Sequence, residues 1–146
     1  RRYNVKAQRL TIELTETAVM ENPEIGLRVL KKMSGIGLRV SIDDFGSGYS
    51  SLSYLKQLPA AEIKLDRSLV MDISTSESSR IIVETSINMA HSLGYKLVAE
   101  GVEDQESARL LQTMKCDWLQ GYWLCHPLPL DDLKTWLNEQ PKLVIE

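Results

Sequence analysis

Cysteine and histidine are scarce in this chain of 146 residues, which contains two of each. Cys116 and Cys125 do not form a CxxC pair, and the two histidines are His91 and His126. A zinc site built from cysteine and histidine needs about four closely spaced ligands, so the sequence argues against one. Two free thiols and no recognisable signal peptide predict a reducing, cytoplasmic setting.

Clusters of basic residues and long apolar runs are also missing. Lys and Arg number 17 against 20 Asp and Glu, which gives a net charge of -3. Without a basic cluster the chain has no footprint for binding a phosphate backbone, so we expect no DNA partner. No apolar run approaches the length of a membrane span, so we expect no membrane segment in this chain. The composition, 43% hydrophobic and 25% charged, is typical of a globular domain with its own core.

Strand and helix patterns alternate along the chain. Period-two alternation and short apolar runs predict strands at residues 10–16, 38–43, 61–66, 95–99 and 117–119. Helical spacing and capping residues predict helices at residues 23–35, 51–57, 77–93, 105–114 and 130–138. This alternation with short connections predicts an α/β fold with a parallel sheet, in one domain or one contiguous part of a domain. We expect the core to include Trp118, Trp123, Leu133, Trp136 and Leu137.

Each predicted strand ends in polar residues that can bind a metal or activate water. They are Glu13, Asp43, Asp44, Lys64, Glu100, Glu103 and Gln120. The carboxyl ends of parallel strands meet at one edge, so several carboxylates can converge there. Such an oxygen-rich set favours a hard cation, Mg²⁺ or Mn²⁺. Two such metals about 4 Å apart can clamp a phosphate and activate water, and a nearby lysine can orient that water.

Each of these residues also has a plain structural interpretation. Asp43-Asp44 alone fits a polar turn after a strand as well as it fits a metal site. A single acidic residue at a strand end is more often a helix cap, and a lone Lys64 is more often solvated. Gln120 can simply belong to a turn, and Glu16 to the surface. The coincidence of polar residues at five strand ends favours the metal site over these separate interpretations.

Five motifs in this order and spacing resemble the EAL-domain family of bacterial cyclic di-GMP phosphodiesterases. They are ELTE at 13–16, DDFGSGYSSL at 43–52, IKLD at 63–66, VAEGVE at 98–103 and QGY at 120–122. The resemblance runs from about residue 8 to residue 140. It implies a TIM-type (β/α)8 barrel with one antiparallel strand. It also implies hydrolysis of one phosphodiester of cyclic di-GMP to give linear pGpG.

The resemblance implies a metal site with named ligands. Glu13 and Asp43 would bind a first metal, and Asp43 would bridge to a second metal that Asp44 also holds. Glu100 would lie near the second metal or its water, and Lys64 would contact the attacking water. The implied cofactors are Mg²⁺ or Mn²⁺ in a two-metal site.

The remaining motif residues are implied to support this site. Glu16 would brace the loop of residues 43–52, which in this family helps to hold the second metal and takes part in dimerisation. Glu103 and Gln120 would complete the polar, catalytic lining. The loop motif is intact, which in this family goes with catalytic competence. The implied partners are cyclic di-GMP and a second copy of the chain, as a homodimer or a higher assembly.

One departure from the family pattern is large. The sequence contains no Glu-Ala-Leu motif, whose glutamate is a metal ligand in this family, and a second ligand, an asparagine, is also missing. About 100 residues of a barrel of roughly 250 are absent. We therefore expect residues 1–146 to be the C-terminal part of a single EAL-type domain, about the last five βα units. The 146 residues alone should be weakly active or inactive; the alternatives are a non-catalytic cyclic di-GMP sensor and a self-associating structural fragment.

Overall fold

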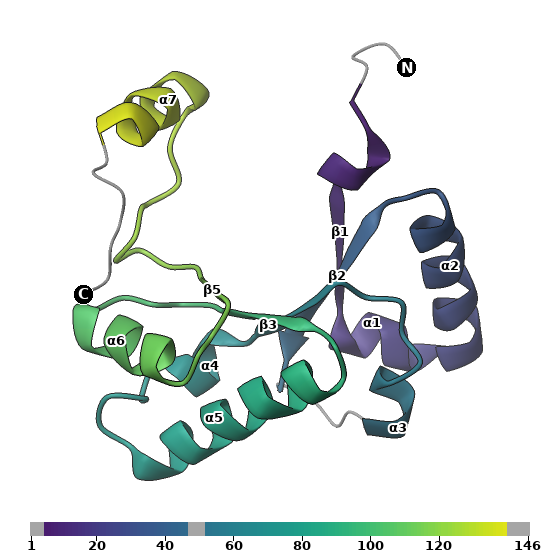
Figure 1. Ribbon diagram of the computed structural model, residues 1–146, viewed down its shortest axis with the longest axis horizontal. Coiled ribbons are helices and arrows are strands. Elements are labelled where there is room, and N and C mark those ends of the chain that lie inside the picture. The colour runs from purple at the N-terminus through teal and green to yellow at the C-terminus, as the bar shows by residue number, and fades with distance from the viewer. Residues whose placement is uncertain (1–4, 47–51, 140–146) are drawn as a thin grey trace.

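The computed structural model describes residues 5–46 and 52–139, and its centre is a parallel sheet (Figure 1). The strands stand in chain order: β1 (Thr11–Thr15), β2 (Arg39–Phe45), β3 (Glu62–Leu65), β4 (Lys96–Ala99) and β5 (Trp118–Leu119). All four neighbouring pairs are parallel. A sheet that grows in one direction in this way has the topology of a section of a (β/α)8 barrel. The predicted α/β fold with a parallel sheet is confirmed.

Helices follow the strands along the outer side of the sheet: α1 (Glu16–Glu21), α2 (Pro23–Gly35), α3 (Leu52–Leu55), α4 (Arg67–Val70), α5 (Glu77–Ser92) and α6 (Gln105–Thr113). A 3₁₀ turn at Ala7–Arg9 precedes β1, and a further helix, α7 (Leu130–Glu139), follows β5. Helix α6 begins where the carboxylate of Asp104 accepts a hydrogen bond from the amide of Ser107, which satisfies an amide that lacks a helical partner. Helices α1 and α4 were not predicted, because six and four residues are too few to show helical periodicity. No helix in the described part of the chain is long and apolar enough to cross a lipid bilayer.

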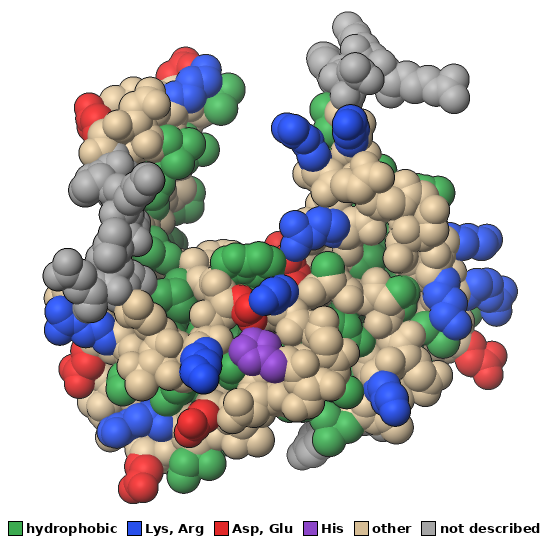
Figure 2. Space-filling view, in the orientation of Figure 1, with side chains coloured by type: hydrophobic (Ala, Val, Ile, Leu, Met, Phe, Trp, Pro, Cys, Tyr) green, Lys and Arg blue, Asp and Glu red, His purple; other side chains and the backbone are tan. Residues whose placement is uncertain are grey.

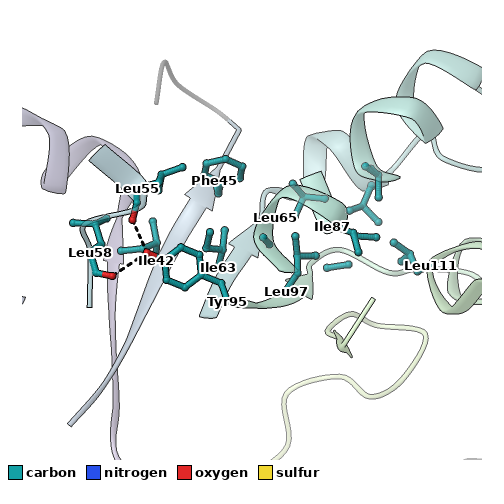
Figure 3. Close-up of a cluster of buried hydrophobic side chains, with 14 of the residues drawn as sticks. Ile42, Phe45, Leu55, Leu58, Ile63, Leu65, Ile87, Tyr95, Leu97 and Leu111 are labelled. Atoms are coloured by element: carbon teal, nitrogen blue, oxygen red, sulfur yellow. Dashed lines mark hydrogen bonds between the residues drawn. The ribbon is translucent and has the colours of Figure 1, made fainter. Parts of the chain in front are cut away.

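The hydrophobic core lies between the sheet and these helices (Figure 3). Alternate residues of the central strands face the helices and are at most 1% exposed; they include Ile42, Ile63, Leu65 and Leu97. Ile87 of α5 and Leu111 of α6 pack in the same cluster. The hydroxyl of Tyr95 donates to the backbone oxygen of Leu58 at 2.9 Å, which fastens the end of the α3 segment to β4. One face of the sheet is therefore packed against the helices, and the opposite face carries the polar residues.

Helix α7 lies apart from the sheet, and Figure 2 shows a hollow between α7 and the N-terminal part of the chain. Leu137 is 60% exposed and Trp118 is 43% exposed, so their prediction as core residues was wrong. Trp118 lies on the sheet face that the helices do not cover, with the guanidinium of Arg39 5.8 Å from its ring centre. Trp123 is partly buried against the core, as expected.

Asp117, just before β5, joins three elements at the amino end of the sheet. Its carboxylate accepts hydrogen bonds from Lys96 Nζ at 2.6 Å and from the amide of Leu97 at 3.0 Å, and it lies 2.7 Å from His91 Nε2. Partial burial raises the pKa of Asp117, but the bonds from Lys96, Leu97 and His91 outweigh burial and lower the pKa to about 2. The charged carboxylate therefore stabilises the folded chain.

Replacing Asp117 with asparagine should lower the free energy of unfolding at neutral pH by about 2 kcal/mol. Because the folded-state pKa lies below the unfolded one, the stabilisation is present above the unfolded value and is lost as pH falls through the folded value of about 2. Urea unfolding across this acidic range should show a shallower pH slope for Asp117→Asn than for the wild type. Asp131→Asn, at a 92% exposed side chain, is the control; identical pH slopes for Asp117→Asn and the wild type would contradict the prediction.

Candidate metal centre

Lys64 of β3 lies among three carboxylates at the carboxyl end of the sheet. Its Nζ atom is 3.2 Å from Glu13 Oε2, 3.1 Å from Asp43 Oδ1 and 2.8 Å from Glu100 Oε1. These acids come from β1, from β2 and from the residue after β4. The parallel topology therefore brings together four of the residues that were predicted to share a site at the strand ends. They are Glu13, Asp43, Lys64 and Glu100.

The lysine side chain is buried, with 7% of its surface exposed. Burial lowers the pKa of Lys64, but the hydrogen bonds from its ammonium to Glu100, Asp43 and Glu13 outweigh that effect and raise the pKa above its ordinary value. In the metal-free chain Lys64 is therefore charged, and its ammonium lies among these three carboxylates.

A bulge near the end of β2 brings Asp43 and Asp44 together. The register between β2 and β3 shifts between Ile42 and Phe45, and Asp44 has a positive φ of 55°, a conformation that aspartate tolerates better than most residues. The amide of Asp44 donates to Asp43 Oδ1 at 3.1 Å. A regular strand would send neighbouring side chains to opposite faces, so the bulge allows both carboxylates to serve one site.

Asp43, Asp44 and Glu100 form a group with the chemistry of a hard-metal site. Each offers a carboxylate oxygen, and these oxygens lie within 4.8 Å of one another. Opposite ligands of Mg²⁺ are about 4.2 Å apart, so small side-chain movements would close the group around such an ion. All-oxygen donors suit Mg²⁺ or Mn²⁺. Glu13 contacts Lys64 and lies outside this group of three, so its predicted role as a ligand stays a prediction.

Glu16 is 3% exposed and contacts the start of the loop that follows β2. Its Oε2 atom accepts a hydrogen bond from the amide of Gly46 at 3.0 Å. The rest of that loop, residues 47–51, lies outside the described residues. The bracing role assigned to Glu16 remains a prediction, and this contact is consistent with it.

Glu103 and Gln120 lie beside Glu100 in a pocket rather than in the group of three carboxylates. The pocket has a volume of about 480 Å³, and its lining includes Arg67, Glu100, Glu103, Gln120, Tyr122 and His126. The rings of Tyr122 and His126 stack with their centres 4.2 Å apart. Arg67, Tyr122 and His126 were not expected at the site from the sequence; the QGY motif, which ends at Tyr122, was the available signal.

Gly121 holds the pocket wall against the segment after β4. The amide of Val102 donates to the backbone oxygen of Gln120 at 3.1 Å, and the amide of Trp123 donates to the oxygen of Val102 at 3.1 Å. A Cβ atom at position 121 would lie 2.1 Å from that oxygen of Val102. Glycine is therefore required for the backbone approach that puts Gln120 next to Glu100 and Glu103.

Comparisons with known proteins found relatives over most of this chain. The family model described as "EAL domain" matches residues 1–127. The signaling protein YkoW of Bacillus subtilis is 40% identical over 140 residues, which cover 96% of this chain and 18% of YkoW. The cyclic di-GMP phosphodiesterase NbdA of Pseudomonas aeruginosa is 43% identical over 88% of this chain and 16% of its own length. The chain thus spans less than a fifth of these curated relatives.

Solved structures show the same fold. The PaMucR phosphodiesterase in complex with c-di-GMP has a TM-score of 0.87 and 38% identity, covering 90% of this chain and 53% of that one. A manganese and cy-diGMP complex of Klebsiella pneumoniae BlrP1 has a TM-score of 0.77 and 36% identity, covering 83% of this chain and 31% of that one. With the family match over residues 1–127, these likenesses show that the chain belongs to the EAL domain family.

Proposed function

We propose that this chain is part of a metal-dependent phosphodiesterase that hydrolyses cyclic di-GMP to linear pGpG. The observation that carries the proposal is the convergence of Asp43, Asp44 and Glu100 beside the buried Lys64. Relatives named as cyclic di-GMP phosphodiesterases, and a related structure that holds manganese and cy-diGMP, support it.

Asp43, Asp44 and Glu100 would hold a divalent cation, and Glu13 would contribute to a neighbouring position. When bound, Mg²⁺ or Mn²⁺ polarises a phosphoryl group and lowers the pKa of water. Lys64 has its ammonium among the same carboxylates, so it can donate a hydrogen bond to the attacking water or to a phosphate oxygen. The pocket beside Glu100 suits a nucleobase, because the Tyr122 and His126 rings offer an aromatic surface and Glu103 and Gln120 offer polar partners.

The 146 residues contain no Glu-Ala-Leu motif, so on their own they should hydrolyse cyclic di-GMP slowly or not at all. The test compares the chain alone with a joined protein, in which the roughly 100 residues that precede the matching segment of NbdA are placed before it. We expect pGpG to form readily with Mn²⁺ or Mg²⁺ in the joined protein and little in the chain alone.

Two other outcomes would change this conclusion. Equal turnover by the chain alone would contradict the expectation that its metal site is incomplete. Binding of cyclic di-GMP by the joined protein, measured by calorimetry with Ca²⁺, combined with no hydrolysis in Mn²⁺, would favour the sensor alternative over the enzyme. Asp131 lies on α7 and outside the group of three carboxylates, so a variant of the joined protein with Asp131→Asn controls for loss of charge.

A further inference from the structure

Two of the carboxylates that contact Lys64 also belong to the group suited to a cation. The Lys64 ammonium is 3.1 Å from Asp43 Oδ1 and 2.8 Å from Glu100 Oε1, and both acids are in the group whose oxygens lie within 4.8 Å of one another. A cation bound to those oxygens at about 2.1 Å would lie within a few ångströms of the ammonium. Two cations this close repel strongly where water is largely excluded.

We propose that Lys64 is an internal counter-cation that holds Asp43 and Glu100 when no metal is bound and competes with the metal for them. The inference rests on the proposed function, because it takes the group of three carboxylates as the metal site. Binding of the metal would loosen Lys64 from Asp43 or Glu100. Glu13, 3.2 Å from the ammonium and outside that group, would then still contact Lys64 as long as the neighbouring position is empty.

The burial and contacts of Lys64 support a competing role. Its side chain is 7% exposed, so water can do little to screen the ammonium from its neighbours. The partners of the ammonium in the described part of the chain are carboxylates, which would repel one another without it. Lys64 thus does in the metal-free chain part of what a metal would do, and it sets the metal affinity below what the carboxylates alone would give.

Competition and a purely structural role predict different results for Lys64→Met. If Lys64 only supports the fold, the variant is less stable both with and without metal, and its metal affinity does not rise. If Lys64 competes, the variant loses stability without metal, and metal restores it. Lys96→Met is a matched control, because Lys96 also lies on the sheet and pairs with an acid, Asp117, at 2.6 Å. It removes the same charge from a different site.

Titration calorimetry of the chain with Mn²⁺ provides the test. We expect Mn²⁺ to bind Lys64→Met at least about tenfold more tightly than the wild type, while Lys96→Met binds like the wild type. The melting temperature of Lys64→Met without metal should fall by about 5 °C, and saturating Mn²⁺ should recover most of the loss.

Any other order of affinities would overturn the proposal. Equal or weaker binding by Lys64→Met does so, and so does an equal gain in Lys96→Met, which would point to net charge alone. If Lys64→Met folds only when Mn²⁺ is present, metal has replaced the lysine, as proposed. If it does not fold at all, Lys64→Gln, which keeps a hydrogen-bond donor, takes its place and must show the same tighter binding. If the joined protein hydrolyses cyclic di-GMP but the Lys64 variants bind Mn²⁺ no more tightly than the wild type, competition is refuted. The proposed phosphodiesterase function would still stand.

Discussion

Replacing Asp43 with asparagine should remove measurable Mn²⁺ binding and lower turnover of cyclic di-GMP by the joined protein roughly 100-fold or more. Asp43, like Glu100, belongs both to the group suited to a cation and to the contacts of Lys64. Asparagine keeps the size of the side chain and one oxygen, but it removes the charge that a hard cation needs. Calorimetry with Mn²⁺ and a pGpG assay would measure the two effects.

The effect of losing one negative charge must be separated from the effect of losing it at position 43. Asp131→Asn removes the same charge from a side chain that is 92% exposed on α7, so it should leave both binding and turnover unchanged. Asp43→Asn should also cost little stability, because Glu13 and Glu100 still neutralise Lys64. Retention of Mn²⁺ affinity in Asp43→Asn would place the metal elsewhere.

The meeting of Asp43, Lys64 and Glu100 at the carboxyl end of the sheet was predictable from the sequence for a simple topological reason. Strands and helices alternated with short connections, which requires parallel strands whose carboxyl ends meet at one edge. Residues at those ends, such as Asp43, Lys64 and Glu100, therefore had to approach one another whatever the details of packing. The structure brings these three into direct contact.

Features that depend on local backbone geometry or on distant packing were not predictable in the same way. Nothing in the residue pattern indicated that a bulge and a positive φ at Asp44 would bring its carboxylate to that of Asp43. Periodicity also cannot tell whether an apolar face meets a partner. Leu137 and Trp118 have the expected spacing, but no described helix covers them, and they are exposed.

Replacing Gly121 with alanine should lower the free energy of unfolding by about 3 kcal/mol. The new Cβ atom would lie 2.1 Å from the oxygen and 2.4 Å from the nitrogen of Val102. These are backbone atoms, and both take part in the hydrogen bonds that join the segment around Gln120 to the segment after β4. The clash cannot be relieved by rotating a side chain, so the two segments must separate. Urea unfolding would measure the loss.

Gly35→Ala is the matched control, because a Cβ atom at position 35 meets nothing within 4 Å. At the end of α2 this substitution should be neutral or slightly stabilising. Gly121→Ala should also weaken nucleotide binding by the joined protein more than Mn²⁺ binding, since Gln120 and Glu103 line the pocket whereas Asp43 and Asp44 lie on β2. Equal stability of the two alanine variants would show that the backbone around Val102 can move. Equal losses of metal and nucleotide affinity would show that the pocket and the acidic group form one cooperative unit.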